Sequence, residues 1–432
     1  MYPRIAGLGV LVLVSLVLSN CGGGNTLNSL PQEQAPPLPP LANQEVPRSA
    51  INHLIVVVMQ NSSFDHLFGT YPNANGLDPT AASYKQVDQA GSTVQPQLLT
   101  NLSPPDVNHT RTTYQVAYDS GKMDKYAFEN GDMSMDYFDN TSIGTANDGQ
   151  QFGVSTLWNY AQQYALADNF FAAAMASEPS NMLYSIASAV GTGTDPFGYP
   201  QLDACSAGLF QQNQSIGASI TPPLTFQTVG DQLSAAKISW TWYHEFFSSE
   251  QNGTCLHYVP QENAFQYFQA TANSPNVQNF TMSGFQSVLV GGTLPSVIWV
   301  TPSPGHSMHP GQGNIANGIE WLDGFIQAVK GSPPWASTAI LVVWDESGGW
   351  YDHVSPPQLS STIGLGARVP VLVISPFAKA TYISHQQMDF VSILRFIQWN
   401  WALGQFSNST QAAREQQSGD ICDLLSATCG AP

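Results

Sequence analysis

The feature that most constrains the fold is an uninterrupted apolar run, residues 339–344, which ends in a cluster of polar side chains. Such a run predicts a strand that is buried on both faces, as in a parallel sheet. Asp345 and Glu346 follow it directly, and a Gly-Gly turn and His353 come next. Ligands bind outside the carboxyl ends of strands in open α/β sheets. The paired acids therefore predict a site for a hard cation, and a solvated turn is the alternative.

Similar apolar runs occur at residues 53–59, 294–300 and 368–376, and residues 317–329 have helical periodicity. Alternating strands and helices predict an α/β fold with a mostly parallel central sheet and helices on both faces. Three of the strands are followed by polar clusters, which strengthens the interpretation as a cation site.

The domain organisation follows from length and composition. We expect a signal peptide with a lipobox-like end at residues 1–21, a flexible tether at 22–48 and one large folded domain at 49–432. Residues 196–285 are rich in turns and aromatic side chains. We interpret them as an aromatic-rich subdomain inserted into the main domain.

The N-terminus predicts export. Its apolar run, residues 5–18, is too short to span a bilayer but suits a signal peptide. Cys21 and the three glycines after it resemble a bacterial lipoprotein signal, although Asn20 is a poor match before the cysteine. We expect a periplasmic or cell-surface protein that is anchored to the membrane through a lipid on Cys21. An ordinary secreted protein is the alternative.

The remaining cysteines fit an oxidising compartment. Four thiols in an exported chain suggest two disulfides. The pairs Cys205–Cys255 and Cys422–Cys429 are the simplest, and other pairings remain open.

The charge balance limits the partners. The formal net charge is -18 and only 10% of the residues are charged. This argues against nucleic acid, whose phosphates need clustered Lys and Arg. Small phosphoesters remain possible, because a metal can hold them. We expect a monomer.

A serine stands at a predicted helix start, in the segment Ser177-Glu178-Pro179. One interpretation is a helix cap with proline in the first turn. The other is a hydroxyl nucleophile, placed where the helix N-terminus favours a phosphate.

Several motifs occur together and in order between residues 50 and 402. They are residues 60–69, His109 with 121–124, 166–171, 307–310, 344–353 and 368–376. In this order they resemble the bacterial phosphoesterases that include non-haemolytic phospholipases C and certain acid phosphatases. The resemblance implies an alkaline-phosphatase-like fold and a divalent metal ion of unknown identity. It also implies cleavage of a phospholipid or a small phosphomonoester through a phosphorylated serine or threonine.

The resemblance also implies roles for individual residues. The metal ligands would be Asn61, Asp345, Glu346 and Gln60. The catalytic residues would be Ser177, His109, His309 and His353. The substrate contacts would be Lys122, Asn181 and His257.

The chain departs from the family pattern at three places. Gln60 stands where a glutamate is usual, and the segment around the nucleophile is one residue longer, so Ser180 is an alternative nucleophile. Gln261-Glu262 replaces a histidine pair. These changes leave open a weakened or inactive relative that serves as an exported ligand-binding lipoprotein. A sulfatase-like hydrolase is less favoured, because no Cys/Ser-x-Pro-x-Arg segment is present.

Overall fold

The computed structural model describes residues 46–176, 178–190, 224–247, 257–272, 274–359 and 364–426. Several predicted features lie outside these ranges: the signal peptide with Cys21, most of the tether, Ser177, Cys205, Cys255 and Cys429. Export, the lipid anchor and the disulfides therefore stay predictions. No helix within the described ranges has the length and apolar character needed to cross a membrane.

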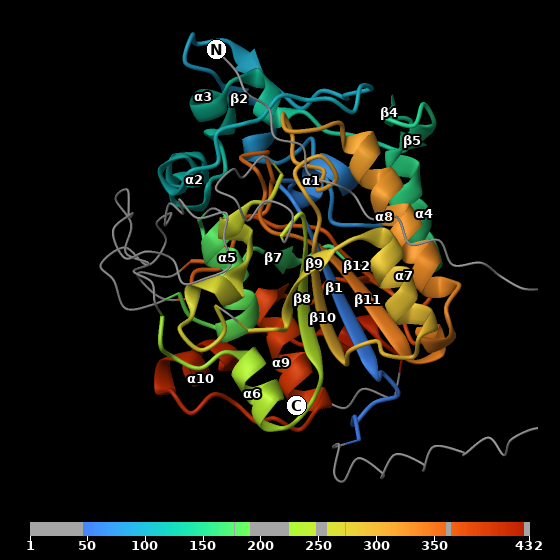
Figure 1. The fold of residues 1–432 in the computed structure, drawn as a ribbon. Helices are drawn as coiled ribbons and strands as arrows, with labels where there is room; N and C mark the ends of the chain where they lie inside the picture. Colours follow the sequence, from blue (N-terminus) through green and yellow to red (C-terminus); the bar gives the residue numbers. More distant parts are fainter. Residues whose placement is uncertain are drawn as a thin grey trace, which may run out of the picture. The chain divides into compact units, whose positions relative to one another are not determined.

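An eight-stranded sheet forms the centre of the domain (Figure 1). Its strands, in spatial order, are β13 (Tyr382–Ser384), β6 (Ala165–Ala167), β12 (Val371–Ile374), β11 (Thr338–Trp344), β1 (His53–Met59), β10 (Val297–Thr301), β8 (Trp240–Glu245) and β9 (Val277–Phe280). Of these eight strands, only β12 runs antiparallel to its neighbours. The predicted α/β fold with a mostly parallel sheet is confirmed.

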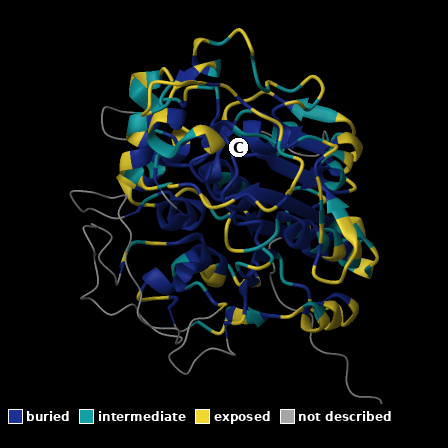
Figure 2. Cartoon of the chain, turned by 90° about the horizontal axis from the view of Figure 1, so that it is seen from above, coloured by how far each residue is buried: buried dark blue, intermediate teal, exposed yellow. Residues whose placement is uncertain are grey.

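Helices pack on both sides of this sheet (Figure 1). One group contains α4 (Val154–Gln163), α7 (Met282–Val290) and α8 (Ile315–Lys330). The other contains α5 (Glu178–Ala187), α6 (Val229–Ala235), α9 (Phe390–Asn400) and α10 (Ser409–Gln416). The central strands β1, β10 and β11 are almost entirely buried, and the middle of the fold is dark blue in Figure 2.

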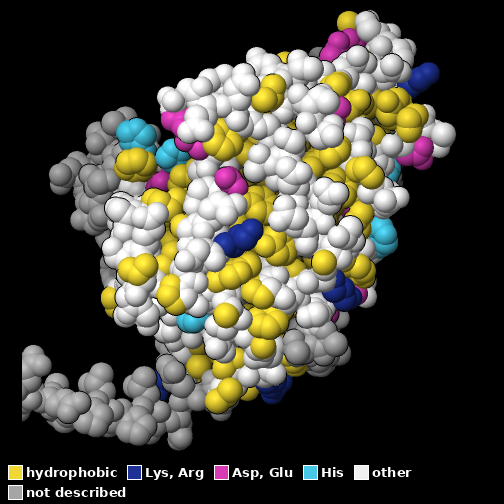
Figure 3. Space-filling view, turned by 90° about the vertical axis from the view of Figure 1, so that its right-hand side faces the viewer, with side chains coloured by type: hydrophobic (Ala, Val, Ile, Leu, Met, Phe, Trp, Pro, Cys, Tyr) yellow, Lys and Arg dark blue, Asp and Glu magenta, His cyan; other side chains and the backbone are white. Residues whose placement is uncertain are grey.

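Shorter elements lie around this core. The helices are α1 (Phe64–Phe68), α2 (Arg111–Tyr118) and α3 (Tyr126–Asn130), and the 3-10 turn η4 (Pro260–Glu262) packs against α5. The two-stranded pairs are β2 (Gln86–Val87) with β3 (Thr93–Val94), β4 (Ile143–Thr145) with β5 (Gln151–Gly153), and β7 (Phe170–Phe171) with β14 (Met388–Asp389). On the face seen in Figure 3, lysine and arginine side chains are sparse, in keeping with only 12 such residues in the chain.

The expectation that residues 196–285 form an inserted subdomain is wrong for part of this range. β8 and β9 fall inside it and are strands of the central sheet. Their aromatic side chains belong to the core, since Trp242 stacks on Trp299 of β10 with ring centroids 6.0 Å apart. β8 has the sequence Trp-Thr-Trp-Tyr-His-Glu and lacks the aliphatic run of the other central strands, so its aromatic side chains resemble those of an inserted segment. Residues 196–223 lie outside the described ranges.

Parallel pairing aligns the ends of the central strands. Met59 of β1 lies opposite Trp344 of β11, and Val57 of β1 lies opposite Val300 of β10. The residues that follow these strands therefore emerge at one edge of the sheet. This edge carries the candidate site.

Leu341→Ala tests the central position of β11. Leu341 is fully buried in the middle of the strand, so its truncation should leave a cavity and cost about 2–5 kcal/mol of unfolding free energy in urea denaturation. Val290→Ala is the control, because this side chain is 75% exposed and its loss should cost less than about 0.5 kcal/mol. Equal costs for the two variants would contradict a buried β11.

Candidate active site

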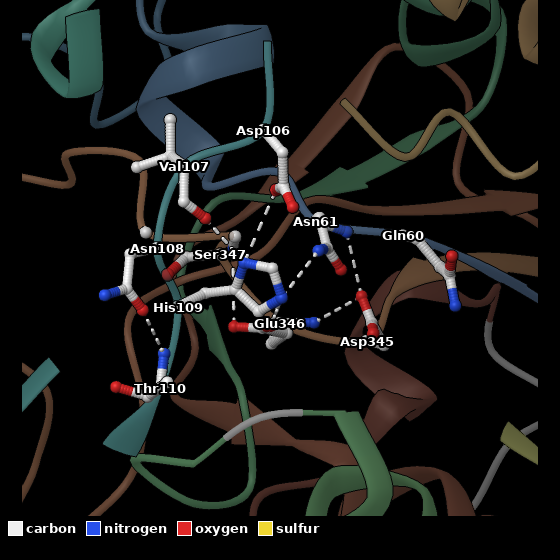
Figure 4. Close-up of polar contacts among 12 residues, drawn as sticks. Gln60, Asn61, Asp106, Val107, Asn108, His109, Thr110, Asp345, Glu346 and Ser347 are labelled. Atoms are coloured by element: carbon white, nitrogen blue, oxygen red, sulfur yellow. Dashed lines mark hydrogen bonds and ion pairs between the residues drawn. The ribbon is translucent and has the colours of Figure 1, made fainter. Parts of the chain in front are cut away.

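Asn61 and Asp345 meet where β1 and β11 end (Figure 4). The backbone N–H of Asn61 donates to Asp345 Oδ1 at 2.9 Å, and the N–H of Glu346 donates to the same oxygen at 2.8 Å. Asn61 has a φ of 60°, a left-handed conformation that asparagine tolerates better than most residues. These contacts hold one carboxylate oxygen of Asp345 in place.

The Gly-Gly turn after Glu346 lets neighbouring loops approach. A Cβ at Gly348, whose φ is 64°, would lie 2.5 Å from the carbonyl oxygen of Asn61. A Cβ at Gly349, whose φ is 76°, would lie 2.5 Å from the carbonyl oxygen of Asn108. Only glycine permits both approaches without strain, so the turn brings Asn61 and the loop of His109 to the acids.

Two histidines determine how the Asn61 amide is turned. Its Nδ2 lies 3.3 Å from Nε2 of His109 and 3.0 Å from Nε2 of His309. Each ring uses its Nδ1 to donate to a backbone carbonyl, Val107 for His109 at 2.6 Å and Pro310 for His309 at 2.7 Å. The amide N–H groups can then donate to both Nε2 atoms. This arrangement leaves Asn61 Oδ1 free to face another group.

Three buried oxygen atoms of this cluster lack a hydrogen-bond partner among the described residues: Asn61 Oδ1, Asp345 Oδ2 and Glu346 Oε1. Buried polar atoms nearly always have a partner, so each exception needs an explanation. One carbonyl and two carboxylate oxygens are the ligands that hard divalent cations prefer. The three residues therefore fit such a cation.

Tyr114 of α2 orients the second acid. Its hydroxyl donates to Glu346 Oε2, and the same oxygen accepts from the N–H of Gly348 at 3.2 Å. His109 Nε2 lies 3.8 Å from Glu346 Oε1, too far for a hydrogen bond. Tyr114 has no motif around it, so no signal in the sequence points to this role.

Burial perturbs the titration of the cluster. It raises the pKa of Asp345 to about 7 and the pKa of Glu346 to about 7. Burial alone would lower the pKa of His109, but the Glu346 carboxylate and the Val107 carbonyl raise it above its usual value. The pKa of His309 is lowered, chiefly by burial. The two histidines are therefore suited to different protonation states near neutral pH.

The side-chain amide of Gln60 forms hydrogen bonds with Ser307 and Glu262. Ser307 Oγ donates to Gln60 Oε1 at 3.0 Å, and Gln60 Nε2 donates to a carboxylate oxygen of Glu262. Figure 4 shows the amide turned away from Asn61 and Asp345. The predicted role of Gln60 as a ligand is therefore not visible in this arrangement. Glu262, noted in the sequence only as part of a replaced histidine pair, is a buried acid.

The start of α5 contributes further buried groups. Ser177 precedes the helix and lies outside the described residues, whereas Ser180 Oγ and Glu178 Oε1 are buried and lack a partner in the described part of the chain. Burial, together with the charges of Glu262 and Asp345, raises the pKa of Glu178 well above its usual value. Asn181 closes the preceding loop instead of facing outward, because its amide bonds to Ala174 N and Ala176 O.

The other predicted site residues make contacts of their own. Lys122 pairs with Asp119 at 3.0 Å, and its side chain is 65% exposed. His257 packs its ring against Phe246, with centroids 4.9 Å apart. His353 Nδ1 lies 2.7 Å from Asp65 Oδ2. The structure thus joins Asn61, Asp345, Glu346, His109 and His309, and the roles of the other three stay predictions.

His353 belongs to a buried network around Arg368. The guanidinium donates to Asp352 Oδ1 at 2.9 Å and to Asp65 Oδ1 at 3.0 Å. It also donates to the backbone carbonyls of Asn75 and Asp168. Asp65, Asp352 and His353 have ligand atoms within 4.8 Å of one another, as a metal site requires, but Arg368 already neutralises the two acids.

Comparison with known families matches residues 51–404 to the phosphoesterase family. The chain belongs to the phosphoesterase family. It is 24% identical over 396 residues to a non-hemolytic phospholipase C of Pseudomonas aeruginosa, covering 81% of this chain and 53% of that protein. It is 25% identical over 405 residues to phospholipase C B of Mycobacterium tuberculosis, covering 80% and 72%.

This phosphoesterase spans about half the length of the Pseudomonas relative. A structure of an alkaline phosphatase superfamily protein from Vibrio parahaemolyticus is also similar, with 10% identity and a TM-score of 0.38, covering 82% of this chain and 77% of that one. A likeness at this level adds no argument about the site.

The raised pKa values predict how stability depends on pH. Between about pH 4 and 7 the folded phosphoesterase holds protons on Asp345 and Glu346 that the unfolded chain releases. The metal-free protein should therefore lose stability as the pH rises through this range, and added Mn²⁺ should oppose the loss. Thermal melting of EDTA-treated protein measures this. Asp345→Asn cannot titrate and should show a shallower slope; an unchanged slope would contradict the assignment.

Arg368→Met tests the second acid pair. It leaves Asp65 and Asp352 buried without their cation and should cost about 3–5 kcal/mol in urea denaturation. Lys379→Met is the control, since Lys379 makes a half-exposed ion pair with Asp423 and should lose at most about 1 kcal/mol. If Arg368→Met loses no more unfolding free energy than Lys379→Met, the network around Arg368 contributes little to stability.

Proposed function

We propose that this chain is a divalent-metal-dependent phosphoester hydrolase that acts through a serine nucleophile and a phospho-enzyme intermediate. The observation that carries the proposal is the set of unpartnered buried oxygens on Asn61, Asp345 and Glu346, beside two histidines. Membership of the phosphoesterase family supports the same chemistry.

Asn61, Asp345 and Glu346 would hold the cation through these oxygens. When bound, the cation would polarise the phosphoryl group and lower the pKa of the serine hydroxyl. The backbone N–H groups of Asn61 and Glu346 keep Asp345 oriented, and Tyr114 does the same for Glu346. The chain thus presents its acids in a fixed arrangement before any ligand arrives.

Ser177 is the proposed nucleophile. Its oxygen would bond to phosphorus while the bond from phosphorus to the alkoxide breaks, giving phosphoserine. Water would then bond to phosphorus and release the serine. The start of α5 favours a phosphate at this point. Burial raises the pKa of Glu178 at this helix start well above its usual value, which reduces its repulsion of the phosphate.

His109 is suited to donate the proton that the leaving alkoxide needs. Its pKa is raised, so Nε2 takes up a proton more readily than in an ordinary histidine, and the hydrogen bond from Asn61 Nδ2 is then lost. His309, with its lowered pKa, is suited to accept a proton from water in the second step. His353, Lys122 and His257 remain proposed substrate or proton-transfer residues.

The substrate class is a phospholipid or a small phosphomonoester. The relatives named phospholipase C favour the lipid ester. Export and a lipid anchor at Cys21 would place the enzyme at a membrane surface. The second candidate, an inactive ligand-binding lipoprotein, is favoured by one observation, the uncharged Gln60 with its amide turned toward Glu262.

Ser177→Ala should lower the turnover rate of p-nitrophenyl phosphate and p-nitrophenyl phosphorylcholine by at least ~10³-fold, because the nucleophile is lost. Ser180→Ala is the matched control and should retain most activity. The assay uses EDTA-treated protein with Mg²⁺, Ca²⁺, Mn²⁺ or Zn²⁺ added back, and EDTA alone should suppress turnover. If Ser180→Ala is the inactive variant, Ser180 is the nucleophile. Folded wild-type protein without turnover under any condition would refute the proposal.

A further inference from the structure

Tyr114 holds one oxygen of Glu346 through its hydroxyl group. The hydroxyl donates to Glu346 Oε2, and its own oxygen accepts from Ser347 Oγ at 3.0 Å and from the backbone N–H of Gly349 at 3.1 Å. A tyrosine hydroxyl carries a single proton. Because two donors already point at the hydroxyl oxygen, that proton is directed at Glu346.

Tyr114 reaches Glu346 from a rigid position. It lies in the first half of α2, whose N-cap Thr110 accepts from the N–H of Thr113, and Tyr114 is only 5% exposed. Glu346 follows β11, so the contact joins distant parts of the chain and forms only in the folded domain. The helix and three hydrogen bonds together hold the hydroxyl in place.

The two oxygens of Glu346 differ in their partners. Oε2 accepts from Tyr114 and from the N–H of Gly348 at 3.2 Å, whereas Oε1 has no hydrogen-bond partner among the described residues. Asp345 shows the same division. Its Oδ1 accepts from the N–H groups of Asn61 and Glu346, and its Oδ2 lacks a partner in the same part of the chain. Each acid therefore offers one oxygen to a ligand and keeps the other bonded to the protein.

The number of oxygens that the site offers affects which cation it suits. Ca²⁺ takes about six to eight oxygen ligands and often uses both oxygens of a carboxylate. Mg²⁺ takes about six, keeps several waters and is held by one or two carboxylates, and Mn²⁺ also favours octahedral oxygen sites. With Asn61 Oδ1, the described residues offer one oxygen each from Asn61, Asp345 and Glu346. Such a set suits Mg²⁺ and Mn²⁺ better than Ca²⁺.

We propose that Tyr114 sets the cation specificity of the site. By occupying Glu346 Oε2, it keeps this acid from binding a cation through both oxygens, which favours Mg²⁺ and Mn²⁺ over Ca²⁺. Tyr114 acts through Glu346 and is therefore a positioning residue. The inference rests on the proposed function, because it assumes that the site binds a cation, and it goes further by naming the class of cation.

Tyr114→Phe tests the proposal, because it removes the hydroxyl and keeps the ring. The dissociation constants of EDTA-treated wild type and variant for Mg²⁺, Mn²⁺, Ca²⁺ and Zn²⁺ are measured by isothermal titration calorimetry. Wild type should bind Mg²⁺ and Mn²⁺ more tightly than Ca²⁺. The variant should lose about 10–100-fold in Mn²⁺ affinity and should keep its Ca²⁺ affinity, since Oε2 can then join Oε1. The ratio of the Ca²⁺ Kd to the Mn²⁺ Kd should fall accordingly.

Tyr160→Phe is the matched control. Tyr160 is also 5% exposed, and its hydroxyl also donates to a carboxylate, Asp323 Oδ1 on α8, at 2.5 Å. This variant should leave the Kd ratio unchanged. Ser347→Ala is a second test that keeps Tyr114 but removes one of the two donors to its hydroxyl. It should shift the ratio in the same direction by a smaller factor.

Several outcomes would overturn the inference. Wild type that binds Ca²⁺ as tightly as Mn²⁺ is one, and a ratio in Tyr114→Phe equal to that of wild type or of Tyr160→Phe is another. If Tyr114→Phe does not fold, an unchanged ratio in Ser347→Ala decides against Tyr114. Wild type that binds none of the four cations refutes the proposed function and this inference together, whereas cation binding that is independent of Tyr114, or limited to Zn²⁺, refutes this inference only.

Discussion

Two carboxylates that folding removes from water are the constraint on which the candidate site depends. Asp345 and Glu346 follow a strand buried on both faces and are at most 1% exposed. Burying a charge without compensation is costly. Backbone N–H groups and Tyr114 satisfy one oxygen of each acid, and the other oxygen of each lacks a partner in the described part of the chain. Such an arrangement is stable with a proton, or with a cation.

The same loop carries a second buried acid, Asp352, whose charge is neutralised by a neighbouring side chain. Asp352, a few residues further on, is paired with Asp65, and the buried Arg368 neutralises both. Asp345 and Glu346 have no salt bridge to lysine or arginine within the described residues. One acid pair is thus completed by the protein itself and stabilises the fold. The other pair lies beside His109, and each of its carboxylates has one oxygen without a hydrogen-bond partner within the described residues, which suits it to a bound ligand.

Departures from a family pattern are informative when they are considered in pairs. Gln60 alone suggests a lost ligand, and Glu262 alone suggests a lost histidine. A hydrogen bond joins these two side chains. A carboxylate acts on a cation through its position and not through its place in the sequence, because electrostatic energy depends on distance.

The sequence by itself determined the strands β1, β10, β11 and β12, the mostly parallel sheet and the acids at its edge. An apolar run such as β11 and the turn after it are local features, so Asp345, Glu346, His109 and His309 could be singled out from pattern and resemblance. Only the tertiary structure decided that β8 and β9 belong to the sheet, that Gln60 turns toward Glu262, that Tyr114 holds Glu346, and that His353 joins Arg368. These outcomes depend on partners far away in the chain. The direction of a side chain is set by the groups that surround it after folding, and these are not encoded in its neighbours along the sequence.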